Sequence, residues 1–262
     1  SSSATNMHDT LRWDIFCAVI DNFGDAGVCW RLARQLAAEQ GAQVRLLIDD
    51  PASLALLVPA IDPECPHQVC NGVVVEHWTP ESPPLEVAEV VIEAFGAPVP
   101  AAYLAAMAGR QPAPVWINLE YLSAEKWIEG CHCLPSPHPR LPLTQWFFYP
   151  GFTAASGGLL REARLIAERD VFRSRPGAFA NFLQRYSIAP PVADALKVSL
   201  FAYQNSALSG LLDAWAQGPG LIWCGVPRGL IHQSVAVWLG QELVEPVQRG
   251  ALTIVPLPFF PQ

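Results

Sequence analysis

Charged residues are scarce in this sequence, and long apolar runs are missing from it. Lys, Arg, Asp and Glu make up 15% of the 262 residues, and 16 basic against 24 acidic residues leave a net charge of −8. Because nucleic acid is bound mainly through lysine and arginine, this charge and the lack of a basic cluster argue against nucleic acid as the main partner. No apolar run reaches the roughly 18 residues that a membrane-spanning helix needs. We therefore expect neither a nucleic-acid nor a membrane partner.

The seven cysteines do not form the pattern of a disulfide scaffold or of a zinc site. Their number is odd, and several, such as Cys17 and Cys224, lie in apolar runs, as small buried hydrophobic residues do. We therefore expect reduced cysteines and a cytoplasmic location. Residues 131–133 (Cys-His-Cys) could begin a zinc site together with residues from 65–70, but the usual two-residue spacing between paired ligands is missing. We expect no metal and no cofactor.

Apolar residues are abundant, at 51% of the chain with 9 Trp and 12 Phe, which is enough for a large core and excludes a disordered chain. Short β-rich runs alternate with segments of helical period, which predicts an α/β fold with a doubly wound, mostly parallel sheet. The first strands are expected at residues 13–20, 44–48, 73–77, 90–94, 115–118 and 146–149. The helices among them are expected at residues 26–40, 53–58, 100–109 and 123–130.

The pattern starts again after a charged connector at residues 161–170, so we expect two Rossmann-like domains, 7–160 and 161–262. In the second domain, strands are expected at 197–203, 221–226 and 252–256, and helices at 208–215 and 234–242. Because the chain ends soon after a strand, where such a domain normally continues into another helix, we expect the second domain to be incomplete and the chain to be part of a longer protein.

The loop after the first strand is the first candidate site, because ligands of open α/β sheets lie beyond the carboxyl ends of the strands. Residues 21–27 (DNFGDAG) contain two glycines but no GxGxxG, and two carboxylates would repel a pyrophosphate. One interpretation makes Asp25 the N-cap of the following helix and Asp21 or Asn22 a turn former. The other makes the loop an acidic pocket for a cationic or hydroxylic acceptor. In the helix itself, Val28, Leu32 and Leu36 form the expected apolar stripe.

Further candidates lie near the ends of other expected strands. Glu93 falls within a strand, where an unpaired charge is costly, and Glu120 and Tyr121 follow the next strand. In the second domain, Phe201 and Tyr203 could stack on a nucleobase or pack into the core. A nucleophilic triad is not supported, since the sequence has no GxSxG and no histidine in a recognisable base context.

Several of these segments together resemble a known family. The segment 13–34 (WDIFCAVIDNFGDAGVCWRLAR) closely resembles the opening of the EarP family, the protein-arginine rhamnosyltransferases that modify bacterial translation elongation factor P. The resemblance spans residues 13–262. Further similar segments are 118–125 (NLEYLSAE), 134–137 (LPSP), 149–152 (YPGF), 156–159 (SGGL) and 258–262 (PFFPQ).

The resemblance implies a GT-B fold, in which two Rossmann-like domains face each other across a cleft. It implies inverting, metal-independent transfer of L-rhamnose from dTDP-β-L-rhamnose to an arginine of elongation factor P, which activates that factor for translation of polyproline stretches. The implied roles are general base for Asp25 and its acceptor-pocket neighbour for Asp21; acceptor binding for Phe23, Glu120 and Tyr121; and donor binding for Asn22, Gly24, Phe201, Tyr203 and Gln262.

This sequence departs from the family in two respects. The family continues into an Arg-Gly-Glu-Asp-Ser motif that grips the donor, and this chain stops before it. Ala26 stands where a bulkier aliphatic residue is frequent. Two other hypotheses stay open: a two-domain GT-B glycosyltransferase that acts on a small hydroxylic acceptor, and a non-catalytic nucleotide-binding or scaffold protein.

Overall fold

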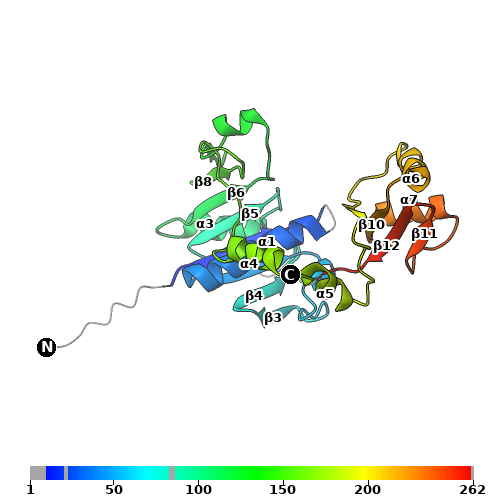
Figure 1. Cartoon of the computed structure of the whole chain (residues 1–262). Helices are drawn as coiled ribbons and strands as arrows, with labels where there is room; N and C mark the ends of the chain where they lie inside the picture. The colour runs from blue at the N-terminus through cyan, green and yellow to red at the C-terminus, as the bar shows by residue number, and fades with distance from the viewer. Residues whose placement is uncertain (1–9, 21–22, 83–85, 261–262) are drawn as a thin grey trace. The chain divides into compact units, whose positions relative to one another are not determined.

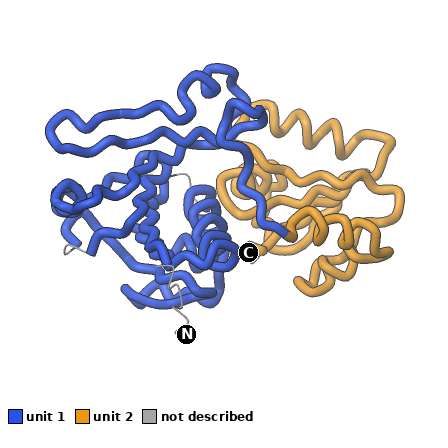
Figure 2. Tube along the Cα trace, turned by 90° about the vertical axis from the view of Figure 1, so that its left-hand side faces the viewer, with its two compact units in different colours: residues 1–163, 261–262 blue, residues 164–260 orange. Residues whose placement is uncertain are grey.

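The computed structural model describes residues 10–20, 23–82 and 86–260, which form two compact units (Figure 2). Unit 1 extends to Ala163, and unit 2 comprises Arg164–Phe260. Each unit is an α/β structure built on one mixed sheet, as the alternation of elements predicted. Among the described residues, no helix has both the length and the apolar character that crossing a membrane would require.

Unit 1 contains an eight-stranded sheet in the order β3-β4-β2-β1-β5-β6-β8-β7 (Figure 1). Its six inner strands pair in parallel, and the edge strands β3 and β7 pair antiparallel with β4 and β8. The strands are β1 Arg12–Cys17, β2 Gln43–Ile48, β3 His67–Cys70, β4 Val73–His77, β5 Val90–Ala94, β6 Val115–Leu119, β7 Pro135–Pro137 and β8 Thr144–Phe148. The helices are α1 Phe23–Gln40, α2 Pro51–Leu57 and α3 Ala101–Gly109, followed by a 3-10 turn at Lys126–Gly130.

The inner strands are apolar because a doubly wound sheet is covered on both faces. On one face, Phe16 of β1 packs with Tyr103 and Met107 of α3. On the other face lies α1, which contacts β1, β2 and β4. The strand expected at 13–20 ends at Cys17, whereas the strand expected at 90–94 is confirmed as β5.

The predicted inner stripe of the first helix is wrong. Val28 is exposed and Leu32 and Leu36 are half-buried, while the fully buried positions of α1 include Ala26, Cys29, Trp30 and Ala33. These residues follow the same helical spacing on a neighbouring stripe. The buried stripe combines small residues with the large Trp30 ring, so packing against the sheet, and not the count of apolar residues, decides which stripe faces inward.

The helix expected at 123–130 is also wrong, because only Lys126–Gly130 form a single 3-10 turn. The Ser123 hydroxyl accepts the Glu125 main-chain amide at 3.0 Å, so it closes a local turn instead of capping an α-helix. The edge strands β3 and β7 were not predicted from the sequence.

Unit 2 contains a four-stranded sheet in the order β11-β12-β10-β9, parallel except for the β11–β12 pair. The expected strand 197–203 is shorter, because β9 ends at Ser199, and α5 and β11 were not predicted. The elements are α4 Leu165–Ser174, α5 Ala178–Gln184, β9 Leu196–Ser199, α6 Leu208–Gln217, β10 Ile222–Pro227, α7 Leu230–Leu239, β11 Val247–Arg249 and β12 Leu252–Leu257.

Candidate functional site

The candidate site in unit 1 lies at the carboxyl ends of β1, β5 and β6, which are adjacent in the sheet. The polypeptide leaves β1 at Cys17 and enters α1 at Phe23. Of the predicted loop residues, Asp21 and Asn22 lie outside the described residues. Gly24 is exposed in the first turn of α1, and a Cβ built there would meet no atom within 4 Å. Packing within the protein therefore does not require a glycine at this position.

Asp25 lies in the first turn of α1, so it is not the residue that precedes the helix, as the N-cap interpretation assumed. Its side chain is turned inward: Asp25 is 1% exposed, and Oδ2 accepts the main-chain amide of Ile20 at 3.0 Å. The N-terminus of a helix favours a negative charge in this position. Because Asp25 is almost fully buried, a base role requires this carboxylate to become accessible to the acceptor.

Two buried cysteines lie beside Asp25. Contact with Cys17 and burial raise the pKa of the Cys29 thiol, and the charge of Asp25 contributes to the rise. Both thiols are fully buried, so they pack as small apolar groups.

A second polar group lies at the ends of β5 and β6. Asn118 donates a hydrogen bond from Nδ2 to Oε1 of Glu120 at 2.8 Å, and Gln145 donates from Nε2 to Oε2 of Glu93 at 2.8 Å. Glu93 and Asn118 are register partners on the two strands. We call Glu93, Asn118 and Glu120 the β5–β6 polar row.

Burial raises the pKa of Glu93, and the negative charge of Glu120 raises it further, while the hydrogen bond from Gln145 opposes the rise. Within the described part of the chain, neither carboxylate of the row is hydrogen-bonded or ion-paired to a lysine or arginine. The row is therefore electronegative. Sequence reasoning singled out Glu93 and Glu120 separately but could not pair them, and it gave Asn118 no role.

The polar row and Asp25 belong to opposite faces of the sheet. Glu93 is the register partner of Phe16, whose ring packs edge-on against Tyr103 of α3 with centroids 5.0 Å apart. Side chains of register partners share a face, so Glu93 and Asn118 project on the α3 side, whereas Asp25 belongs to α1. An acceptor that reaches both must lie across the strand ends.

Aromatic side chains flank the polar row. Tyr121 is half exposed and stacks on Phe95, with ring centroids 4.3 Å apart and planes 12° from parallel. Tyr149, beyond the end of β8, stacks on Phe147, and burial raises its pKa, as does the charge of Glu120. The structure thus brings the predicted residues Glu120 and Tyr121 to one edge of the sheet. The Phe95, Phe147 and Tyr149 rings beside them were not among the predicted site residues.

In unit 2, Phe201 and Tyr203 lie in the segment after β9 and are 86% and 69% exposed. The alternative that these rings pack into the core is therefore wrong. Exposed rings beyond the carboxyl end of a parallel strand are suited to stacking on a flat ligand. Gln262 lies outside the described residues.

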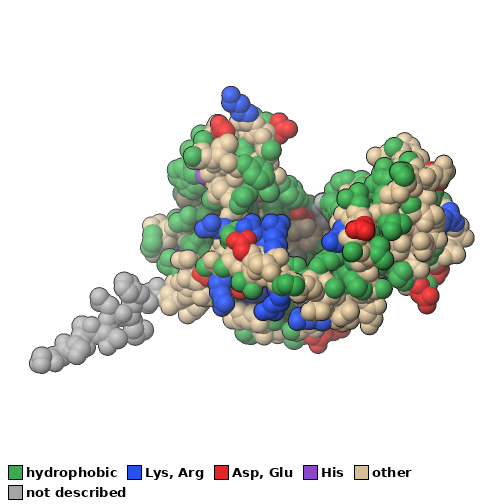
Figure 3. Space-filling view, viewed as in Figure 1, with side chains coloured by type: hydrophobic (Ala, Val, Ile, Leu, Met, Phe, Trp, Pro, Cys, Tyr) green, Lys and Arg blue, Asp and Glu red, His purple; other side chains and the backbone are tan. Residues whose placement is uncertain are grey.

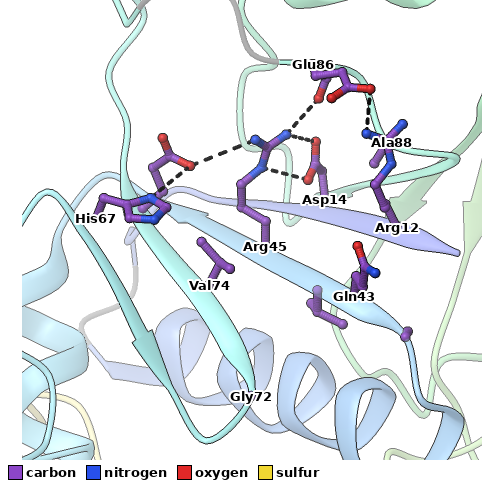
Figure 4. A pocket seen from close by; sticks show the side chains of 12 residues that line it. Arg12, Asp14, Gln43, Arg45, His67, Gly72, Val74, Glu86 and Ala88 are labelled. Carbon is purple, nitrogen blue, oxygen red and sulfur yellow. Dashed lines mark hydrogen bonds and ion pairs between the residues drawn. The ribbon is translucent and has the colours of Figure 1, made fainter. Parts of the chain in front are cut away.

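A cavity of about 450 Å³ lies at the opposite, amino-terminal ends of β1, β2 and β4 (Figure 4). Arg45 binds the buried Asp14 through Nη2 at 2.6 Å, and Arg12 contacts Glu86 at 2.6 Å. The Tyr103 hydroxyl also donates to Asp14, and burial together with the Asp14 charge raises the pKa of Tyr103. The charged side chains that line the cavity are paired with one another. We therefore interpret them as a structural ion-pair network and not as the candidate site.

The structure offers no metal centre in its described part, where no three His, Cys, Asp or Glu side chains cluster. Residues 131–133 lie in a turn, and all seven cysteines are free thiols. The candidate chemistry in unit 1 therefore consists of carboxylates, an amide and aromatic rings.

Comparison with known proteins relates this geometry to a family. The family described as elongation-factor P (EF-P) rhamnosyltransferase EarP matches residues 13–262. The protein-arginine rhamnosyltransferases of Pseudomonas putida KT2440 and Pseudomonas aeruginosa PAO1 are 47% and 45% identical, over 95% of this chain and 67% of each relative. That of Shewanella oneidensis is 35% identical over the whole chain and 69% of its own length.

A solved structure gives the same relation. The structure that describes EarP-mediated arginine glycosylation of translation elongation factor EF-P is 32% identical, with a TM-score of 0.57. The match covers 97% of this chain and 62% of that one, so the chain spans about two thirds of the length of its relatives. By sequence and by fold, this chain belongs to the EarP family of elongation-factor P rhamnosyltransferases.

Proposed function

We propose that the protein containing this chain transfers L-rhamnose, with inversion, from dTDP-β-L-rhamnose to an arginine side chain of translation elongation factor P. The observation that carries the proposal is the match of residues 13–262 to the EarP family, with relatives named protein-arginine rhamnosyltransferases at 45–47% identity. The electronegative strand ends of unit 1 support it, because a guanidinium needs carboxylate partners.

An arginine acceptor poses a specific chemical problem. Its guanidinium is a poor nucleophile, because the lone pairs are delocalised and the group stays protonated up to a pH of about 12. Carboxylates can hold it through paired hydrogen bonds and turn one nitrogen toward the anomeric carbon of the sugar. As the C–N bond forms and the bond to the diphosphate breaks, the attacking nitrogen becomes acidic and a carboxylate can take its proton. In this proposal Asp25 is that base, with Asp21 beside it.

Unit 2 serves the donor in this proposal. Two Rossmann-like units are the components of a GT-B enzyme, and we propose that arrangement here. Phe201 and Tyr203, exposed beyond β9, would stack on the thymine ring. The departing nucleoside diphosphate would be stabilised by main-chain amides at helix N-termini, so that the reaction needs neither metal nor cofactor.

A cytoplasmic location and the absence of nucleic-acid and membrane partners belong to the same proposal. None of the seven cysteines forms a disulfide, and free cysteines are typical of proteins in a reducing compartment. On the face drawn in Figure 3, apolar and uncharged side chains surround a group of Lys and Arg side chains that lies next to acidic ones.

The test is transfer itself. The full-length protein, dTDP-rhamnose and purified elongation factor P are incubated, and the factor is analysed by mass spectrometry. We expect one deoxyhexose on one arginine, and none on a factor whose acceptor arginine is replaced by alanine. Modification of a small hydroxylic acceptor with the factor left unchanged would support the alternative glycosyltransferase. Failure to bind or turn over dTDP-rhamnose would refute both.

A further inference from the structure

We propose that the β5–β6 polar row, Glu93, Asn118 and Glu120, is the subsite that recognises the guanidinium of the acceptor, and that Asn118 is a positioning residue for Glu120. This inference rests on the proposed arginine acceptor and deepens it. It adds Glu93 and Asn118 to a site for which the sequence motifs indicated only Glu120 from these two strands.

Asn118 is a buried amide whose side-chain oxygen has no hydrogen-bond donor among the described residues. It is 7% exposed, and its Nδ2 donates to the Glu120 carboxylate at 2.8 Å. A carboxylate can only accept here, so the amide cannot be turned around, and Oδ1 must face elsewhere as an acceptor. That Oδ1 is buried and has no hydrogen-bond partner among the described residues. Because buried polar atoms are nearly always satisfied, this oxygen indicates a missing N–H or O–H donor.

Glu93 is a half-buried carboxylate whose hydrogen-bond partner is a neutral amide. It lies beside Asn118 in the adjacent strand, and its Oε2 accepts the Gln145 amide at 2.8 Å. Burial works against its charge, Glu120 adds repulsion, and no cation of the described chain compensates either carboxylate. Keeping such a carboxylate half-buried without a cationic partner carries a local cost, which a cationic ligand removes.

The chemistry of the row selects the ligand. Two carboxylates and one amide oxygen are all acceptors, so an anion such as a phosphate is repelled. Neighbouring strands lie about 4.8 Å apart, a separation that the planar fork of five N–H donors in a guanidinium can bridge. A lysine ammonium is a point charge without this fork. The row therefore favours arginine over lysine.

A recognition role and a purely structural role of Glu93 predict different effects of replacing it with glutamine. The folded-state pKa of Glu93 is raised, so ionisation of Glu93 destabilises the fold as the pH rises above the ordinary carboxyl pKa. Glu93→Gln keeps the shape, removes the repulsion with Glu120 and should leave the thermal midpoint at neutral pH unchanged or higher. If the row binds the acceptor, the same variant must use elongation factor P less well.

The experiment compares the full-length protein with Glu93→Gln, Asn118→Leu and the control Glu64→Gln. Glu64 is an exposed carboxylate of the same unit, so its variant makes the same charge change outside the row. We expect both row variants to raise KM for elongation factor P by about 10- to 100-fold, the range for losing a hydrogen bond to a charged group. Affinity for dTDP-rhamnose, measured by calorimetry, and the kinetics of Glu64→Gln should not change.

The outcomes separate the two proposals. If the unaltered protein does not modify the factor, the proposed function fails. If it does, but Glu93→Gln keeps the original acceptor KM, or loses acceptor and donor binding to the same extent, the recognition role of the row is refuted. Should Asn118→Leu fail to fold, Glu93→Gln decides alone, because that variant relieves repulsion instead of creating it.

Discussion

The ion pair between Asp14 and Arg45 should be the most costly charge pair to break in unit 1. Asp14 is 2% exposed and accepts from Arg45 Nε at 2.9 Å and Nη2 at 2.6 Å, as well as from the Tyr103 hydroxyl. In Asp14→Asn the shape is kept, but an amide N–H then faces the guanidinium. The Arg45 side chain, 21% exposed, is left with the Glu86 carbonyl at 2.9 Å and Glu76 at 4.0 Å.

The magnitude follows from these contacts. Removing one member of a buried pair costs about 3–5 kcal/mol, because the other charge stays behind uncompensated. The remaining partners of Arg45 place Asp14→Asn near the lower end, about 3 kcal/mol. For comparison, Asp170→Asn removes an exposed partner of Arg169, and this loss should be below about 1 kcal/mol.

The assay is urea unfolding of the full chain, monitored by tryptophan fluorescence. The slope m of the unfolding free energy against urea concentration is compared between variants. Asp14→Asn should lower the midpoint of the unit 1 transition without a change in m. The double change Asp14→Leu with Arg45→Met should recover much of the loss, since apolar residues can replace a buried pair at little cost. A loss for Asp14→Asn no larger than that for Asp170→Asn would refute the reasoning.

Three further predictions follow from the site and its charges. Asp25→Asn should lower kcat by about 10²- to 10⁴-fold, as expected for a lost general base, while calorimetry shows donor affinity retained; equal loss of both would contradict the base role. Phe201→Ala should weaken dTDP binding by about 1–3 kcal/mol without changing the thermal midpoint, because the ring is 86% exposed; unchanged binding would exclude stacking. Ion pairs lower the pKa of Glu89 and of Glu162 from the ordinary 4.5 to about 2, so their stabilisation is complete above 4.5 and is lost as the pH falls toward 2. Midpoints of urea unfolding should decrease across this window, and Glu162→Gln should flatten the decrease; an unchanged slope would show that the Arg31–Glu162 pair contributes nothing.

Much of the fold could be predicted because its signals are local. The inner strands β2, β5 and β6 are runs of β-branched and apolar residues, and short connections between strands and helices imply parallel pairing. The edge strands β3, β7 and β11 were missed, because they are three or four residues long and carry no alternation. Their pairing with a neighbour defines them, and a single segment does not encode that pairing.

The candidate site divides in the same way. Glu120 and Tyr121 were correctly placed beyond a strand end, since position after a strand is readable from the sequence. The hydrogen bond of Asn118 to Glu120 and the inward turn of Asp25 were not readable, because each depends on rotamers and neighbours. The roles of these residues in transfer stay predictions.

The sequence by itself determined the alternation of elements and the family, because continuous segments such as 13–34 carry both. The tertiary structure alone decided that Glu93 lies beside Asn118, that the Trp30 stripe of α1 is the buried one, and that Asp14 meets Arg45 and Tyr103. The physical reason is that hydrophobic pattern and turn chemistry act over a few neighbouring residues. Charge compensation and close packing, in contrast, act between residues that only the folded sheet brings together.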